Sequence, residues 1–317
     1  MKYEFEAGDA RISVVATEEE MGQAAQKLIR QRACDAVAAG KRVVFWLMAA
    51  PSGFAWYDSF IRDCHEDPEF AHVVQSAHFF QFDDYRIPRG DARFPVTFRH
   101  LLEERVFDRL GSAHPGDDHV HPLELMGNAS DAITVLSYRE ELQTFLKDPE
   151  TVVIQVKGIG MDGHWGFHGR ETGIDHPAEF MEVPINRQNR IQQTLDWPQY
   201  FADLAAVPDT AVTASVALFI KADVIVDLVP QRSKLFAVLA TYGTERVIPE
   251  IPSSAIKWHR DAHSFVTEAA AEALVQFRTT GTLTPEIIAD LDRIWQNDED
   301  SRQWSREILN RIHPIFT

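Results

Sequence analysis

This chain of 317 residues has little cysteine, a deficit of basic side chains and no long apolar run. Its two cysteines, Cys34 and Cys64, form no C-x-x-C pair, so we expect buried thiols and no disulfide framework. The net charge of −17 disfavours nucleic-acid and membrane partners, because anionic surfaces would repel the chain. The N-terminus carries acids where a signal peptide needs a cationic start. We therefore expect a soluble cytoplasmic protein.

What is present centres on the stretch from Thr151 to Arg170. An apolar, β-branched run ends there in a glycine-rich segment that contains Gly160, Asp162 and His164. This pattern is typical of a buried strand with polar side chains at its carboxyl end, where open α/β sheets bind ligands. The glycines allow a ligand to approach the backbone closely, and a carboxylate beside an imidazole is a common acid/base pair.

Residues 158 to 163 also spell the dinucleotide fingerprint G-x-G-x-x-G. That fingerprint needs a helix opening at its last glycine, so that the pyrophosphate meets the helix N-terminus. The sequence HWGFHGRETG follows instead, and its three further glycines indicate a loop. We therefore expect no dinucleotide here, and no cofactor is implied.

Two further strand ends carry polar residues. A strand from Lys41 to Met48 runs into AAPSG and a helix, so Ser52 and Gly53 could hold a phosphate at the helix N-terminus, or form a plain turn. A strand from about Ala77 to Phe82 ends in Asp83 and Asp84. Buried carboxylates need partners or shifted pKa values, so these two are site residues or a helix cap.

Other charged residues are less specific. Arg187 and Arg190 could bind an anion or lie on the surface as ordinary arginines. Lys234 lies in the first turn of a helix, against the dipole preference, which makes it a better functional candidate. The His- and Asp-rich segment from Gly111 to His121 matches no metal spacing, so we expect a solvated loop and no metal.

Alternating strands and helices predict one doubly wound α/β domain over residues 1–278, with a mostly parallel Rossmann-like sheet and helices on both faces. Residues 279–317 form a C-terminal helical extension that packs on this body or on a second copy in a homo-oligomer. Thr17 caps a first long helix, and Ser130 caps another from Asp131 to Lys147. The apolar side of that later helix comprises Ile133, Leu136, Leu142 and Phe145.

The segments FQFDDY, GNASD, GIGMDGHWGF, TASVALFIKADVIVDLVPQRSK and PSSAIKWHRDAHSFVTEAAA together resemble, in order, landmarks of the glucosamine-6-phosphate deaminase/isomerase and 6-phosphogluconolactonase superfamily. The resemblance spans roughly Thr17 to Phe277. Tyr85 after the two acids is more similar to the deaminase/isomerase branch. The chain is thus identified as a divergent member.

The resemblance implies roles for these residues. Asp83 matches the carboxylate that moves a proton between C1 and C2 of an opened amino sugar. His164 matches the ring-opening acid/base, and Asp162 holds its tautomer. Ser52 and Lys234 match phosphate-binding positions, and a phosphorylated sugar is the expected small-molecule partner. The mechanism requires no metal.

The chain departs from the family pattern in three places. Gly169 stands where the deaminases place a relay glutamate, with His168 and Glu171 nearby. Pro51 removes a backbone donor from the phosphate loop. The family's phosphate arginine has no clean match, although Arg187, Arg190 and Arg232 are near in sequence.

Four interpretations follow from the residues and the resemblance. The leading one is isomerisation of an (amino)hexose 6-phosphate, with or without loss of ammonia. Lactone hydrolysis is the second, because His164 could activate water while Asp83 only binds substrate. A non-catalytic sugar-phosphate sensor and an unrelated α/β protein with a structural Asp-Gly-His turn remain the other two.

Overall fold

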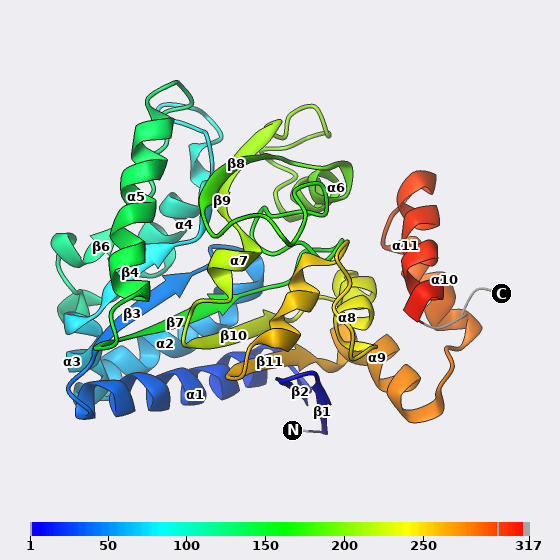
Figure 1. Cartoon of the computed structure of the whole chain (residues 1–317), viewed down its shortest axis with the longest axis horizontal. Helices are drawn as coiled ribbons and strands as arrows, with labels where there is room; N and C mark the ends of the chain where they lie inside the picture. The colour runs from blue at the N-terminus through cyan, green and yellow to red at the C-terminus, as the bar shows by residue number, and fades with distance from the viewer. Residues whose placement is uncertain (1, 297, 313–317) are drawn as a thin grey trace.

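The computed structural model describes residues 2–296 and 298–312, and its centre is an eight-stranded sheet (Figure 1). The strand order is β1-β2-β11-β10-β7-β3-β4-β6. The β1 strand is antiparallel to β2, and the other neighbours are parallel. The strands of this sheet are β1 (Tyr3–Ala7), β2 (Ala10–Val15), β3 (Arg42–Leu47), β4 (His78–Gln81), β6 (Val120–His121), β7 (Thr151–Lys157), β10 (Val224–Val229) and β11 (Ala262–Thr267).

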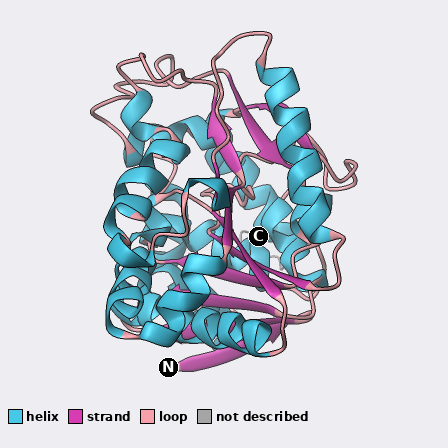
Figure 2. Cartoon of the chain, turned by 90° about the vertical axis from the view of Figure 1, so that its left-hand side faces the viewer, coloured by secondary structure: helices cyan, strands magenta, loops and turns pink. Residues whose placement is uncertain are grey.

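Helices cover both faces of the sheet, as the sequence predicts (Figures 1 and 2). Thr17 caps the first helix by accepting a hydrogen bond from the Glu20 amide at 3.1 Å, and that helix packs along four central strands. The helices are α1 (Glu18–Ala38), α2 (Phe54–Glu66), α3 (Pro68–Ser76), α4 (Phe98–Arg105), α5 (Asp131–Leu146), α6 (Arg187–Asp196), α7 (Val216–Phe219), α8 (Leu235–Tyr242), α9 (Glu268–Thr280), α10 (Pro285–Arg293) and α11 (Glu299–Ile312).

A second, three-stranded antiparallel sheet extends the molecule beyond the carboxyl end of β4. Its strands are β5 (Asp83–Tyr85), β8 (Phe180–Pro184) and β9 (Thr210–Ala214), in the order β5-β9-β8. Since β5 follows β4 after one residue, Phe82, the two predicted acids stand in this small sheet and not in a loop. The sequence pattern does not predict β8 or β9, because each strand has only five residues and is too short to show a strand period.

Three local predictions need correction. Ser130 makes no side-chain cap bond, and the carboxylate of Asp131 accepts the amides of residues 126 and 127 instead, at 2.7 and 3.0 Å. Ile133 and Leu136 are 71% and 44% exposed, so only the later part of the predicted apolar side is buried. The segment from Gly111 to His121 is not simply a solvated loop, because β6 pairs with β4 and His121 stacks on Phe80.

The C-terminal helices α10 and α11 contact the main body. Trp295 and Trp304 pack edge-on against Phe236 of α8, with ring centroids 5.7 and 5.1 Å apart. Ser301 accepts a hydrogen bond from Gln188 of α6 at 2.9 Å. These contacts connect the end of the chain to α6, a helix of the candidate site.

The described residues, 2–296 and 298–312, were compared with the requirements of a membrane-spanning helix and of a metal site. No helix in this part is both long enough and apolar enough to cross a bilayer. The same residues contain no group of His, Cys, Asp and Glu side chains arranged to hold a metal ion.

Candidate active site

The predicted acid/base pair lies on the turn that follows β7. Nδ1 of His164 lies 2.5 Å from Oδ1 of Asp162, and both side chains are buried. Burial alone would raise the pKa of Asp162, but the interaction with His164 and a hydrogen bond from Asn186 hold that pKa well below its usual value. Asp162 is therefore ionised and fixes the orientation of the imidazole, which leaves Nε2 for acid/base work.

Gly160 is required by the position of this imidazole. A Cβ atom at residue 160 would lie 2.0 Å from Cε1 of His164, far inside van der Waals contact. The amide of Gly160 donates to the carbonyl of His164 at 3.1 Å, so ring and backbone form one compact turn. Residues 158–179 contain no helix, so the glycines lack the helix N-terminus that a dinucleotide site needs.

A hydrogen-bonded chain runs outward from this pair. Asn186 donates to Asp162 Oδ2 at 2.9 Å and to Glu171 Oε2 at 3.0 Å. The carboxylate of Glu171 occupies the space beside Gly169, where an added Cβ would lie 2.9 Å from Oε2. His168 is buried and bonds backbone groups elsewhere. Of the two residues suggested as replacements for the relay glutamate, the geometry places Glu171 in the chain.

Asp83 and Asp84 differ completely in their surroundings. Asp83 is 2% exposed, lines the cavity, and its Oδ1 has no hydrogen-bond partner in the part of the chain described. Burial, and then the neighbouring charge of Asp84, raise the pKa of Asp83 well above its usual value. A carboxyl group that is buried and unpartnered at the edge of a cavity is suited to exchange a proton with a ligand.

Asp84 instead holds α4 in place. Its carboxylate accepts the amides of Phe98 and Arg99, at 2.8 and 3.1 Å, and the side-chain amide of Gln81 at 3.1 Å. Burial raises the pKa of Asp84 to about 6, while Arg99 and these donors oppose that shift. Asp84 does not line the cavity, so its position is that of a helix cap and not of a ligand-binding residue.

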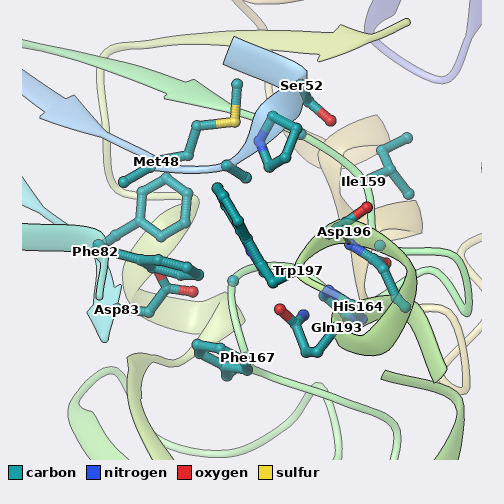
Figure 3. A pocket seen from close by; sticks show the side chains of 18 residues that line it. Met48, Ser52, Phe82, Asp83, Ile159, His164, Phe167, Gln193, Asp196 and Trp197 are labelled. Carbon is teal, nitrogen blue, oxygen red and sulfur yellow. Dashed lines mark hydrogen bonds between the residues drawn. The ribbon is translucent and has the colours of Figure 1, made fainter. Parts of the chain in front are cut away.

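The cavity lies between the carboxyl ends of β3, β4 and β7 and the helix α6 (Figure 3). Asp83 and His164 lie on its two sides, with the indole of Trp197 between them. The free volume is about 50 Å³, well below the ~300 Å³ of a typical ligand pocket. A sugar can therefore enter only if side chains of the lining move. The other large apolar side chains of the lining are Met48, Phe82, Phe98, Ile159 and Phe167.

The sequence reading missed the contribution of α6. Gln192, Gln193, Asp196 and Trp197 all line the cavity, and Gln192 donates to Asp196 at 3.1 Å. The sequence contains a pattern that could have indicated this. Gln192 and Asp196 are four residues apart and therefore share one side of α6, and this side is polar where the side of a helix that faces a core would be apolar. Only the packing of α6 against the glycine turn identifies that side as functional.

Of the residues predicted to bind a phosphate, only Ser52 lines the cavity. Ser52 lines the cavity, and its hydroxyl donates to Gln231 at 3.0 Å, whereas Gly53 adjoins the cavity without lining it. Lys234 is 3% exposed and does not line the cavity. Arg190 bonds the carbonyl of residue 185 at 3.0 Å and pairs with Asp209, so it too lies outside the lining.

A buried ion pair stabilises the end of β7, directly before the glycine turn. Nζ of Lys157 lies 3.0 Å from Oδ1 of Asp227, and both side chains are fully buried. Tyr242 donates to the other oxygen of Asp227 at 2.7 Å, and the ammonium lies 4.6 Å from the centre of the Trp165 ring. Burial lowers the pKa of Lys157, and Asp227 opposes that shift. These contacts hold the last residue of β7 directly before the glycine turn.

Comparison with known proteins agrees with this architecture. No family model matches the chain. Glucosamine-6-phosphate deaminase from Shewanella loihica is 27% identical over 196 residues, which cover 62% of this chain and 66% of the enzyme. The enzyme of the same name from Shouchella clausii is 24% identical over 263 residues, which cover 81% of this chain and 95% of the enzyme.

Solved structures show the same fold. A monomeric glucosamine-6-phosphate deaminase superposes with a TM-score of 0.67 at 20% identity, covering 83% of this chain and 99% of that one. The 6-phosphogluconolactonase of Trypanosoma brucei superposes with a TM-score of 0.61 at 18% identity, covering 83% and 98%. The sequence matches and the shared fold lead to one conclusion: the chain is similar in sequence to glucosamine-6-phosphate deaminases and has the fold that these enzymes share with 6-phosphogluconolactonase.

Proposed function

We propose that this protein is an isomerase or deaminase that transfers a proton between C1 and C2 of a ring-opened (amino)hexose. Glucosamine 6-phosphate, named in its deaminase relatives, is the first substrate to test. The observation that carries the proposal is the buried carboxyl of Asp83, whose Oδ1 has no partner among the described residues, across the cavity from His164. An aldose-to-ketose conversion needs such a base for a proton α to a carbonyl.

We assign ring opening to His164 and the proton transfer from C2 to C1 to Asp83. His164, held by Asp162, exchanges a proton with the ring oxygen as the sugar opens. Asp83 then takes the proton from C2 and returns it to C1. For an amino sugar, this transfer leaves an imine at C2, which water hydrolyses to the ketone and ammonia. Asn186 and Glu171 position Asp162 and do not touch the reacting atoms.

Lactone hydrolysis is the second candidate function. The pair of His164 and Asp162 alone could activate a water molecule toward an ester carbonyl, and Asp83 would then only bind substrate. The fold shared with 6-phosphogluconolactonase is compatible with this reaction. Replacing Asp83 by Asn separates the two, because isomerisation needs its basicity and hydrolysis does not.

The test is a proton NMR time course with glucosamine 6-phosphate in deuterated buffer, beside a His164→Ala control. Loss of the C2 proton signal that depends on His164 would support enolisation, even where release of ammonia is slow. If no (amino)hexose or hexose phosphate loses its C2 proton, while 6-phosphogluconolactone is hydrolysed, the isomerase proposal is wrong and the second function takes its place.

A further inference from the structure

The C-terminal helices reach the candidate site through the side chain of Arg170. Its guanidinium carbon lies 4.3 Å from the centre of the Trp304 ring on α11. Its Nε donates to Oε1 of Glu171 at 3.1 Å, and its Nη2 donates to Oε1 of Gln188 on α6 at 3.2 Å. One side chain therefore joins α11, α6 and the carboxylate that continues the hydrogen-bonded chain behind His164.

Glu171 needs such an anchor because it comes from an irregular segment. Residues 169–179 contain neither helix nor strand, and the side chain of Glu171 is 35% exposed. Its Oε2 accepts the side-chain amide of Asn186 at 3.0 Å, and the same nitrogen donates to Asp162 at 2.9 Å. A long exposed side chain loses rotamer entropy when it is held, so one hydrogen bond would fix it weakly. The bond from Arg170 to the other oxygen restricts the carboxylate to the orientation that Asn186 uses.

Trp304 in turn restricts Arg170. A guanidinium stacked on an indole is stabilised by the aromatic face, and its planar donors stay aligned with a neighbouring carboxylate. The indole itself is fixed on the main body, because it packs edge-on against Phe236 and Trp295, with ring centroids 5.1 and 6.0 Å apart. The extension therefore presents a rigid aromatic surface to the one arginine that holds Glu171.

The extension also holds the start of α6, and α11 lies beside that helix (Figure 1). Nε2 of Gln188 donates to Oγ of Ser301 at 2.9 Å, and both side chains are buried. Nε of Arg187 lies 2.6 Å from Oδ1 of Asp298. Since Asn186 is the N-cap of α6, these contacts fix the backbone that carries its amide.

We propose that Arg170 is a positioning residue for the acid/base pair and that Trp304 acts through it, so that the C-terminal extension completes the candidate site. The contacts lead from α11 to the pair through Trp304, Arg170, Glu171, Asn186 and Asp162. The inference deepens the proposed isomerase/deaminase function and rests on it for the activity assay alone. Its main readout is the hydrogen bond between Asp162 and His164, which needs no turnover.

The experiment follows the Nδ1–H proton of His164 by NMR in the ¹⁵N-labelled full-length chain, with the signal assigned by its loss in His164→Ala. Asp162 accepts this proton across 2.5 Å, so we expect slow exchange with water in the wild type. Arg170→Met keeps the length of the side chain and removes its donors and charge. It should accelerate the exchange roughly tenfold, as for the loss of one hydrogen bond to a charged group. The kcat for C2 exchange should fall by a similar factor with KM unchanged, because Arg170 does not touch the substrate.

Two further substitutions test the role of Trp304. Trp304→Phe keeps an aromatic face and should keep the slow exchange, whereas Trp304→Leu should behave like Arg170→Met. In the double variant, Trp304→Leu should add nothing to the effect of Arg170→Met, because both act through the same contacts. The matched control is Arg311→Met, which removes the ion pair between α11 and Glu250 and should leave the exchange unchanged.

The outcomes separate this inference from the proposed function. Unchanged proton exchange in Arg170→Met overturns the positioning role, and additive effects of the two substitutions overturn the part assigned to Trp304. A wild type whose Nδ1–H exchanges too fast to be observed overturns the inference as well, because the pair is then not held. If the wild type leaves the C2 proton of every hexose phosphate in place, the proposed function fails, and the His164 signal still decides the role of Arg170.

Discussion

Asp83→Asn should make the protein more stable and at the same time strongly reduce the proposed isomerisation. The carboxyl of Asp83 is buried, and its Oδ1 has no partner in the part of the chain described. Burial and Asp84 raise its pKa well above the usual value, so its ionised form is costly in the folded state. An amide of the same shape removes that cost and also removes the base.

The magnitude follows from the unpaired group. A buried group without a partner costs about 1–3 kcal/mol when it is neutral and more when it is charged, so Asn keeps the neutral cost and removes only the excess due to charge, which we take as about 1–3 kcal/mol. An unfolding entropy of about 2.1 cal/mol/K per residue gives a chain of 317 residues a change in Tm of about 1.5 °C per kcal/mol. Asp83→Asn should therefore raise Tm by about 2–5 °C, while C2 exchange falls by about 10²- to 10⁴-fold.

The pH dependence has a definite sign. Because the pKa of Asp83 is raised, the folded protein keeps a proton that the unfolded chain releases. The wild type therefore loses stability as pH rises from the ordinary Asp pKa toward the folded pKa, and Asp83→Asn removes that loss. The exchange rate of the wild type should rise through the same range, because only the ionised carboxylate accepts a proton.

Thermal unfolding from pH 4 to 9 and deuterium exchange at C2 measure these two effects. Asp84→Asn is the matched control, because its carboxylate accepts the amides of Phe98 and Arg99 and should cost about 2–3 kcal/mol when replaced. If Asp83→Asn lowers Tm as Asp84→Asn does, Asp83 is a structural residue and the reasoning is wrong. Retained isomerisation in Asp83→Asn would likewise refute its role as the base.

Three further predictions concern the surroundings of the pair. Gly160→Ala should reduce kcat/KM by roughly 100-fold, because its Cβ displaces the ring of His164. The same clash should lower Tm, and adding His164→Ala should restore Tm because it removes the ring. Asn186→Leu should lower kcat by roughly 10- to 100-fold and change its pH profile; it should also lower Tm by about 1–3 °C, because Asn186 caps α6, and an unaltered pH profile would contradict the positioning role. Asp227→Leu should cost about 3–5 kcal/mol in urea unfolding, because it strands the buried Lys157, and adding Lys157→Met should restore most of that stability.

Local patterns were sufficient for five strands of the main sheet, β3, β4, β7, β10 and β11, and for the glycine turn, but not for β1, β2 and β6. Apolar runs such as β7 and capped helices such as α1 depend on residues close in sequence, so periodicity predicts them well. The pairing of Asp162 with His164 is equally local, since the two residues lie on one turn. The predicted burial of Ile133 and Leu136 was wrong, because among the described residues no element covers these two side chains of α5, which stay exposed.

The amino-acid sequence by itself determined the strand, the turn and the acid/base pair, because each depends on neighbouring residues. Only the tertiary structure decided which of two adjacent acids is free, since side chains alternate along β5 and send Asp83 to the cavity and Asp84 to α4. It also brought Asp196 and Trp197 into the cavity from α6. These assignments depend on packing between segments far apart in the chain, which no local pattern records.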